Sequence, residues 1–429
     1  MSKLTSDNKA NFEERNWAGN FAFSASRVET PASVGEILQL VAHAERLKGL
    51  GSRHSFTPIA DTEGTLVSPR LLGQQISLDV TRREVTVPAG VRYGELAEYL
   101  SMRGYALPNL ASLPHISVVG ACATATHGSG VGNGNLATSV RAFELVTGRG
   151  DFRQISVARD GEKFNGAVVH LGALGIVTSI ALEVVPAFSV AQTVYTNLKL
   201  EELLRNFDEI VSSAYSVSLF TDWSSDTINQ VWLKERVESG ACVTPRLNLY
   251  GALPAAMECH PVAGMPTESC TPQMGVPGPW HRRLSHFKLE HTPSVGDELQ
   301  TEYFVSRADG PEAIRRISRL KNKINPLVLT SELRTVAADS LWLSPNYQRD
   351  SLGIHFTWKR DMSAVLAVLP EIEQVLGDLK PTPHWAKIST MSAEVVRSRF
   401  PRLDDFRRLA QELDPHGRCH NEFLRKFVL

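Results

Sequence analysis

Cysteine is scarce in this 429-residue sequence, and its placement argues against two classes of protein. The five cysteines are odd in number and far apart, at Cys122, Cys242, Cys259, Cys270 and Cys419. This pattern does not fit the disulfide framework of a small secreted domain. Close ligand pairs such as C-x-x-C are also absent, so we expect reduced thiols and no metal site, even though His260 lies between two of the cysteines.

Neither sign of charge predominates. Lys plus Arg total 45 and Asp plus Glu total 46, which gives a formal net charge of -1. Such a balance gives no electrostatic reason to expect nucleic acid or an anionic membrane as a partner, and neutral small molecules fit better. The first ten residues are polar and lack an apolar signal core, so a cytoplasmic protein is expected.

No hydrophobic run has the character of a membrane span. The longest apolar stretch, residues 167–185, is interrupted by polar residues and glycines such as His170, Gly172 and Glu183, and two buried strands are expected there. Hydrophobic residues still make up 42% of the chain, which is enough for large cores. At roughly 150 residues per domain, the length predicts two or three domains.

Several catalytic and nucleotide-binding motifs are missing. Gly128, Gly130, Gly132 and Gly134 alternate strictly and fail the G-x-G-x-x-G spacing of dinucleotide-binding folds. The sequence contains no G-K-[ST] of a P-loop and no H-E-x-x-H, and Ser129 lacks the first glycine of G-x-S-x-G. These absences argue against a nicotinamide dehydrogenase, a nucleotide hydrolase, a zinc peptidase and a serine hydrolase.

Short strands alternate with helices in the first part of the chain. A helix is predicted over residues 33–48, with Thr30 as its cap and Pro31 in its first turn. A strand over residues 84–87 and a helix over 93–103 follow. This alternation indicates an α+β domain.

The pattern then changes. An amphipathic helix is predicted over residues 200–213, followed by strands over 217–223 and 227–233. Prolines interrupt residues 240–280, which are expected to form a long surface excursion. A last helix is predicted over residues 397–413. The change of pattern indicates a second domain.

A single imidazole lies inside a glycine-containing turn in the segment Leu50-Gly51-Ser52-Arg53-His54-Ser55-Phe56. Glycine lets a backbone approach a ligand closely, and successive N–H groups can cradle a pyrophosphate. The segment alone is equally compatible with a histidine that caps or packs a loop.

A second segment, residues 111–130, consists mainly of small and hydroxylated residues. Its sequence is Ala-Ser-Leu-Pro-His-Ile-Ser-Val-Val-Gly-Ala-Cys-Ala-Thr-Ala-Thr-His-Gly-Ser-Gly. Such a backbone can lie flat against a large planar ligand, while N–H and hydroxyl groups donate to phosphate and ring oxygens.

Together the two segments resemble the flavin-binding domain of the vanillyl-alcohol-oxidase type, and in particular its branch of sugar-alcohol and aldonolactone oxidases. The resemblance extends from about Trp17 to the C-terminus. It implies an α+β fold with a PCMH-type FAD-binding domain over residues 11–187, completed by 388–429. A substrate domain over 188–387 would hold an antiparallel sheet flanked by helices.

In this family the histidine that matches His54 bonds covalently to the flavin. A doubly attached relative would carry a cysteine just ahead of Ala111, but Asn109 and Leu110 stand there, so a single link is predicted. The resemblance implies FAD contacts with residues of both segments and one residue beyond them: Leu50, Gly51, Ser52, Arg53, His54, Ser55, Ala111, Ser112, Ser117, Gly120, Thr124, Ala125, Thr126, His127 and Val177.

Polar side chains share faces of three predicted strands. Alternation places Glu332 and Arg334 on one face of their strand, and His355 and Thr357 opposite an apolar face of theirs. Gln300 joins this surface if a third strand pairs in the same sheet. Taken singly, such faces are more often exposed to solvent.

The resemblance favours a functional role for these faces. Five positions match those that line the substrate pocket of sugar-alcohol oxidases, and a sixth matches a serine that contacts both flavin and substrate; they are Glu332, Arg334, His355, Thr357, Lys387 and Ser112. Because an unpaired buried hydroxyl costs about 1–3 kcal/mol, a polyol needs such a mixture of donors and acceptors.

The implied reaction is oxidation of the terminal hydroxyl of an alditol, such as xylitol or sorbitol, to the aldose, by hydride transfer to FAD and reduction of dioxygen to hydrogen peroxide. Arg334 and Lys387 would stabilise alkoxide character, and His355 would accept or relay the proton. Ala111 matches a position where alanine can restrict oxygen access, so a dehydrogenase stays open, although an oxidase is favoured. An aldonolactone enzyme and a non-catalytic flavin carrier also stay open, and a monomer is expected.

Overall fold

A three-stranded parallel sheet supports the first predicted cofactor segment. The computed structural model describes residues 14–429 except 74, 239–242 and 292–295, so the opening segment and Cys242 lie outside the described residues. Helix α1 (Val34–His43) connects two strands of this sheet. The strand order is β1 (Arg27–Glu29), β3 (Thr65–Val67) and β2 (Leu47–Gly49). The turn that contains His54 therefore starts directly from a strand.

The second sheet of the N-terminal half is antiparallel. Its order is β4 (Ser77–Asp79), β5 (Glu84–Pro88), β9 (Gly175–Glu183), β7 (Val140–Thr147) and β8 (Phe152–Ser156). Helices α2 (Tyr93–Ser101), α3 (Val118–Ala123), α4 (Val157–Asp160) and α5 (Glu162–Val168) accompany it, and β6 (Tyr105–Ala106) pairs with β10 (Val185–Pro186). The expected strand over 84–87 is confirmed.

Among the described residues, the largest sheet is nine-stranded and antiparallel. Its order is β14 (Leu253–Pro254), β11 (Ser189–Lys199), β13 (Thr227–Val237), β12 (Ser216–Thr221), β17 (Val328–Val336), β18 (Ser351–Lys359), β16 (Glu298–Ser306) and β19 (Thr382–Pro383), with β15 (Gly278–Pro279) on β11. Its accompanying helices are α6 (Leu200–Arg205), α7 (Phe207–Val211), α8 (Gly310–Ser318), α9 (Lys321–Ile324) and α10 (Met362–Leu376). On β18, Leu352, Ile354, Phe356 and Trp358 are fully buried, as the alternation predicts.

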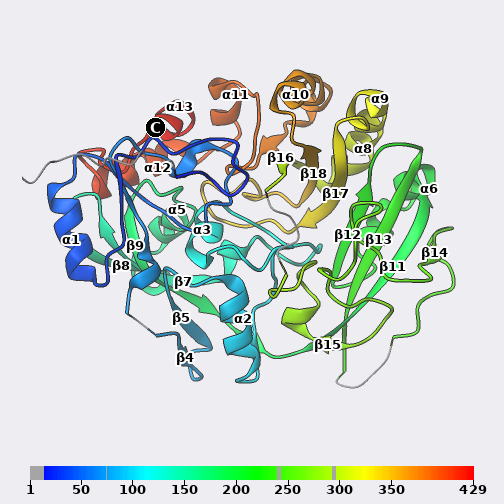
Figure 1. The fold of residues 1–429 in the computed structure, drawn as a ribbon, viewed down its shortest axis with the longest axis horizontal. Helices are drawn as coiled ribbons and strands as arrows, with labels where there is room; N and C mark the ends of the chain where they lie inside the picture. The colour runs from blue at the N-terminus through cyan, green and yellow to red at the C-terminus, as the bar shows by residue number, and fades with distance from the viewer. Residues whose placement is uncertain (1–13, 74, 239–242, 292–295) are drawn as a thin grey trace, which may run out of the picture.

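The last helices return to the N-terminal half. Helices α11 (Ala393–Arg397), α12 (Leu403–Leu413) and α13 (Glu422–Phe427), orange to red in Figure 1, lie beside the blue N-terminal elements. The amide Nδ2 of Asn421 donates to the backbone oxygens of Pro58, Ile59 and Asp61 at 3.0, 3.1 and 2.8 Å. This side chain thus fastens the chain just beyond His54. No helix in the described ranges has the length and hydrophobicity needed to cross a membrane.

Two helices predicted in the N-terminal part end earlier than expected. The first begins after Ser33, whose hydroxyl accepts from the Glu36 backbone N–H, and ends at His43, since residues 47–49 are needed as strand β2. Thr30 and Pro31 therefore lie outside it. The second, α2, ends at Ser101.

Three further predictions divided the chain into elements at the wrong places. Residues 167–185 hold the end of α5 and one long strand, β9, rather than two strands. The helix predicted over 200–213 is broken at Asn206, whose side chain bonds to Glu202. The helix predicted over 397–413 is two helices, α11 and α12.

The excursion predicted over 240–280 lies only partly at the surface. Cys270, Thr271, Gln273 and Trp280 are each no more than 1% exposed. The segment packs along the edge strand β11, with which β14 and β15 pair. Prolines stop it from forming long strands but do not keep it away from the core.

Candidate active site

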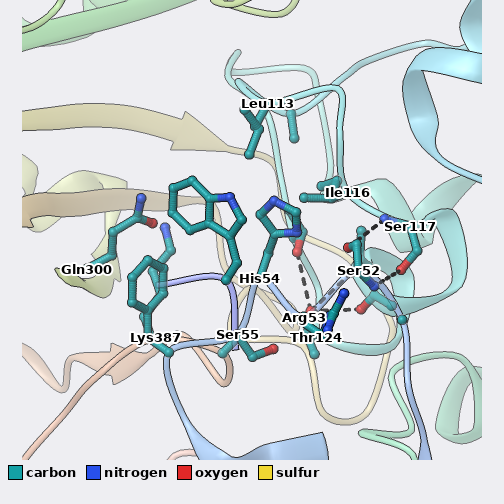
Figure 2. A pocket seen from close by; sticks show the side chains of 18 of the residues that line it. Ser52, Arg53, His54, Ser55, Leu113, Ile116, Ser117, Thr124, Gln300 and Lys387 are labelled. Carbon is teal, nitrogen blue, oxygen red and sulfur yellow. Dashed lines mark hydrogen bonds between the residues drawn. The ribbon is translucent and has the colours of Figure 1, made fainter. Parts of the chain in front are cut away.

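A cavity of about 590 Å³ separates the two candidate cofactor segments from the polar strand faces. It is lined by all of the predicted cofactor and substrate residues except Ala125. Ala125 is buried and has a φ of 54°, so it turns the chain behind the wall of the cavity. In Figure 2, Ser117 lies on one side of His54, and Gln300 and Lys387 lie on the other. The structure therefore brings the two predicted sets of residues to one place.

The turn around His54 is held from several directions. Arg53 has a φ of 64° and forms an ion pair with Glu14, and its carbonyl oxygen accepts from the Trp17 N–H at 2.9 Å. The Trp17 ring stacks on the imidazole of His54 with a centroid separation of 5.2 Å. This position of Trp17 was not predictable, because nothing in the local sequence links it to His54.

His54 has the character of an unprotonated nucleophile. Burial lowers its pKa to about 4, against a smaller opposite effect of the Ser52 backbone. Its Nδ1 atom is buried and makes no hydrogen bond of ordinary geometry in the described part of the chain. A neutral imidazole with a free nitrogen suits attachment to a flavin.

The two loops beside His54 pack closely against each other. The Ser52 hydroxyl accepts from the Ser117 N–H at 2.9 Å, and the Ser117 hydroxyl accepts from the Ser52 N–H at 3.4 Å. A Cβ atom on Gly51 would lie 2.5 Å from the Ser117 Oγ atom, and one on Gly120 would lie 2.7 Å from it. Only glycine allows this approach, which leaves a wall of backbone and small side chains for a planar ligand. The residues present therefore fit FAD.

Three paired strands place the polar side chains next to one another. Strand β18 lies between β17 and β16, and His355 faces Glu332 on one side and Glu302 on the other. Glu332, Arg334 and His355 are only 5%, 5% and 6% exposed. The interpretation that these faces are open to solvent is therefore wrong, and Gln300 joins the same sheet as expected.

Glu302 is the centre of this network, although the strand alternation did not single it out. Its carboxylate accepts from Arg334 Nη2 at 2.9 Å and from Lys387 Nζ at 2.6 Å, and it lies 3.2 Å from His127 Nε2. Burial alone would raise the pKa of Glu302, but Lys387, His127 and Arg334 hold it well below its ordinary value. The sequence did contain one indication: Glu302 is two residues from Gln300, so the two side chains share a face of the strand.

Lys387 and His355 form a directional pair. The Lys387 ammonium donates to His355 Nδ1 at 2.8 Å, so His355 Nε2 carries the proton and donates to Thr357 Oγ1 at 3.0 Å. Burial and then Lys387 lower the pKa of His355 to about 4. Burial also lowers the pKa of Lys387, and Glu302 opposes that effect.

Arg334 connects the strand face to the second cofactor segment. Its Nη1 donates to the Ser112 hydroxyl at 3.2 Å, while Glu332 lies 3.5 Å from its Nε. Burial acts to lower the pKa of Arg334, but Glu332 and Glu302 raise it above its ordinary value. A permanently cationic group thus lies between the two walls of the cavity.

Comparison with known proteins agrees with this geometry. Residues 25–156 match the family described as FAD binding domain, and residues 297–427 match D-arabinono-1,4-lactone oxidase. The chain is 48% identical over 416 residues to an alditol oxidase from a Streptomyces species, covering 96% of this chain and 98% of the relative. It is 27% identical over 449 residues to an L-gulono-1,4-lactone dehydrogenase from Mycobacterium tuberculosis, with the same coverage of each.

A solved structure shares the whole fold. A cholesterol oxidase from Brevibacterium sterolicum superimposes with a TM-score of 0.76 at 16% identity, covering 100% of both chains. Fold and site therefore define a FAD-dependent oxidoreductase of the vanillyl-alcohol-oxidase type. The chain belongs to the family of FAD-linked oxidases that includes alditol oxidase and the aldonolactone oxidases. The fold class and the FAD cofactor expected from the sequence are confirmed.

Proposed function

We propose that this protein oxidises the terminal primary hydroxyl of alditols, such as xylitol and sorbitol, to the aldose and passes the electrons to dioxygen. The observation that carries the proposal is the buried polar surface of β16, β17 and β18, which faces the cavity with both donors and acceptors. A polyol can satisfy such a surface, because each of its hydroxyls donates and accepts. The resemblance to the Streptomyces alditol oxidase supports the same substrate class.

The charge of the site supports a neutral substrate. With Lys387 protonated, the carboxylates of Glu302 and Glu332 are balanced by the cations of Arg334 and Lys387, and the pKa of His355, lowered to about 4, makes that imidazole neutral at pH 7. Lys234 does not line the cavity, and burial lowers its pKa to about 7. A substrate that carried its own charge would enter this dry site without a counter-ion, which is costly. Alditols and lactones carry no charge and so fit this site, whereas sugar acids are anionic and do not.

FAD, held covalently through His54, would supply the oxidising power by accepting a hydride from the carbinol carbon and giving the electrons to dioxygen. The side chains of this protein would bind and deprotonate the alcohol. Arg334 would stabilise negative charge on its oxygen, and Ser112, Gln300, Glu332 and Thr357 would orient the remaining hydroxyls.

The proton would leave through His355 to Lys387. With Lys387 neutral, His355 Nδ1–H donates to the amine, and its Nε2 atom is free to accept the proton of the substrate hydroxyl. Transfer of the Nδ1 proton then leaves a Lys387 ammonium next to the Glu302 carboxylate, 2.6 Å away. Glu302 would therefore hold Lys387 in place and stabilise the product of this transfer.

A second candidate substrate is an aldonolactone, favoured by the match of residues 297–427 to D-arabinono-1,4-lactone oxidase. Mixing the purified protein without oxygen with xylitol, sorbitol or an aldono-1,4-lactone and following loss of flavin colour distinguishes the substrates. We expect bleaching by the alditols. Bleaching by lactones alone would favour the lactone enzyme, and bleaching by none would favour a flavin carrier.

The same proposal includes the division into a FAD-binding domain over 11–187 and 388–429 and a substrate domain over 188–387. We also propose that the protein is cytoplasmic and monomeric, and gel filtration tests the oligomeric state.

A further inference from the structure

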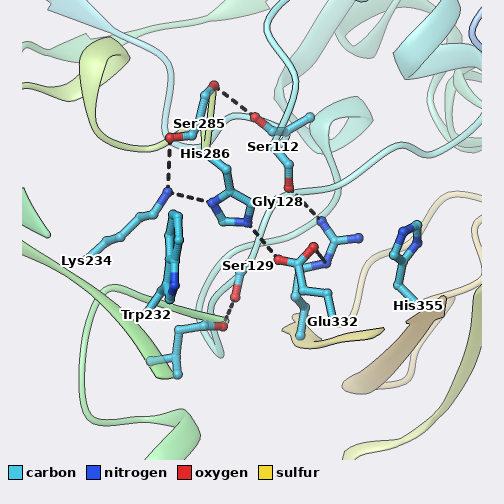
Figure 3. Close-up of polar contacts among 12 residues, drawn as sticks. Ser112, Gly128, Ser129, Trp232, Lys234, Ser285, His286, Glu332 and His355 are labelled. Carbon is cyan, nitrogen blue, oxygen red and sulfur yellow. Dashed lines mark hydrogen bonds and ion pairs between the residues drawn. The ribbon is translucent and has the colours of Figure 1, made fainter. Parts of the chain in front are cut away.

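A buried chain of three side chains ends on Glu332. Lys234, on β13, contacts His286 Nδ1 through its Nζ atom at 3.0 Å, and His286 Nε2 contacts Glu332 Oε1 at 2.7 Å. Figure 3 shows the lysine, the imidazole and the carboxylate in a row. The sequence does not predict this role for Lys234 or His286, because nothing local relates residues 234, 286 and 332.

The contacts of Lys234 determine which nitrogen of His286 carries its proton. In addition to its contact with His286, the Lys234 ammonium donates to the backbone oxygens of Leu284 and Ser285 at 2.5 and 3.1 Å. Burial lowers the pKa of Lys234 to about 7, and Glu332 opposes that effect. Below that pH all three N–H groups of the ammonium are used, and His286 Nδ1 has to accept. The proton then resides on Nε2, which donates to Glu332.

The surroundings hold the His286 ring in one orientation. The rings of Phe220 and Trp232 meet it edge to face, with centroids 5.5 and 5.2 Å away. Lys234 and His286 are 1% and 4% exposed. Without water to compete, the order of donors and acceptors along the chain is fixed.

The backbone beside His286 is attached to the second cofactor segment. The His286 N–H donates to the Ser112 carbonyl oxygen at 3.0 Å, and the Ser285 hydroxyl donates to that of Ala111 at 2.9 Å. Since Arg334 donates to the Ser112 hydroxyl, His286, Ser112, Arg334 and Glu332 form a closed ring of contacts. His286 thus contacts both Glu332 and the segment against which the flavin is expected to lie.

One acceptor in this ring, Glu332 Oε2, remains available to a substrate. Glu332 Oε1 is engaged by His286, whereas Oε2 lies 3.5 Å from Arg334 Nε, which is buried without a hydrogen-bond partner in the described structure. A substrate hydroxyl can donate to Glu332 Oε2. An ether or carbonyl oxygen can only accept.

We propose that His286, oriented by Lys234, is a positioning residue that keeps Glu332 as a pure hydrogen-bond acceptor and so makes the Glu332–Arg334 pair a subsite for a substrate hydroxyl. The inference rests on the proposed function, since it assigns a role toward its substrate. It concerns binding rather than proton removal, so the substrate affinity should depend on His286 more than the turnover does.

Kinetics of three variants test the role toward substrate. His286→Phe keeps the ring packing but removes the donor, and we expect kcat/KM for xylitol to fall roughly 10- to 100-fold, mainly through KM. His286→Gln keeps a donor and an acceptor and should recover most of that loss. The matched control is His281→Phe, in the same segment but outside the cavity lining, which should leave both constants unchanged.

A fall in kcat alone, or equal losses in His286→Phe and His286→Gln, would overturn the proposal. If His286→Phe does not fold, the double variant Lys234→Met with His286→Phe removes the buried ammonium along with its partner. We expect the double variant to show the same fall in kcat/KM, mainly through KM, and wild-type kinetics would contradict the proposal.

Histidine ¹⁵N NMR tests the proton position without any substrate. The signal missing in His286→Phe identifies the ring, which should be the neutral Nε2–H tautomer at pH 6, below the pKa of Lys234 and above that of His286. Burial and Lys234 lower the pKa of His286 to about 4, so Lys234→Met should make it take up a proton at higher pH. An Nδ1–H tautomer or a cationic ring in the wild type would refute the inference. A wild type that oxidises no alditol would instead refute the proposed function.

Discussion

The imidazole of His54 is uncharged near pH 7, and its Nδ1 atom is buried without a hydrogen-bond partner among the described residues. Both arise from burial against Trp17 and the cofactor loops, and neither can be read from the turn sequence alone. A buried imidazole nitrogen without a partner is costly. His54, unlike His115 and His281, also lines the cavity, so we expect its imidazole to be the point of flavin attachment.

Replacing His54 by alanine should abolish covalent flavin. We expect wild-type protein to keep a yellow fluorescent band after denaturing electrophoresis and His54→Ala to lose it, with the flavin released into the acid supernatant. His115→Asn is the control, since His115 also has a buried Nδ1 atom without a partner in the described structure but does not line the cavity. Fluorescence that persists in His54→Ala would show a different anchor.

The pH dependence of the reaction should report Lys387. If neutral Lys387 is needed to receive the proton, kcat/KM is low when the amine is protonated and rises with pH through its pKa, which burial lowers. Glu302→Gln removes the anion that opposes this lowering, so the rise should move to lower pH by roughly 1–3 units. Glu312→Gln, on the surface of α8, should leave it in place, and an unmoved rise in Glu302→Gln would contradict the relay.

Helix α5 joins the flavin half to the loop after β17. A Cβ atom on Gly166 would lie 2.2 Å from the ring of Trp342. The backbone N–H of Trp342 donates to the Asn165 carbonyl oxygen at 3.1 Å. The Trp342 ring also lies under Arg402, 4.5 Å from the guanidinium carbon. Helix and loop can approach this closely only because residue 166 has no side chain.

Gly166→Ala should therefore destabilise the protein. Overpacking of a buried contact costs about 1–3 kcal/mol, which outweighs the ~1 kcal/mol that alanine gains over glycine in a helix. Gly132→Ala is the matched control, because a Cβ there meets nothing within 4 Å. Urea unfolding compares the two variants, and equal midpoints would show that the contact relaxes without cost.

Strand faces were predictable where alternation was strong. Glu332 with Arg334 and His355 with Thr357 emerge from a two-residue period, and the sheet confirms them. Glu302 was missed because only the strand order, with β18 between β16 and β17, shows what it opposes. The ends of helices were predicted wrongly for a similar reason. Whether residue 47 continues a helix or starts a strand depends on its pairing with β3, and the local sequence carries no information about that pairing.

The protein as a whole buries several neutral histidines. Burial lowers the pKa of His170 to about 3 and those of His286 and His355 to about 4, with smaller contributions from nearby lysines. In the unfolded chain these rings take up protons near pH 6.5, while in the folded chain they remain neutral to much lower pH. Protonation therefore favours the unfolded state over this range.

Stability should fall as the pH is lowered from about 6.5 to 4. Each of the three rings contributes a loss of roughly 1.4 kcal/mol per pH unit, or roughly 4 kcal/mol per unit together. Urea midpoints at pH 7, 6 and 5 measure the slope, and His286→Phe should reduce it by about one third. A midpoint that does not change between pH 7 and 5 would mean that these rings do not stay neutral.

Asn421 has a consequence for how the protein is made. It supplies the hydrogen bonds that hold three carbonyls just after His54, yet it is separated from Pro58 by 363 positions. After the ribosome has synthesised the loop that follows His54, it must add nearly all the rest of the chain before Asn421 can form its hydrogen bonds to that loop. Early folding during synthesis cannot complete the cofactor site, so the proposed attachment of flavin to His54 would belong to the last stage of maturation.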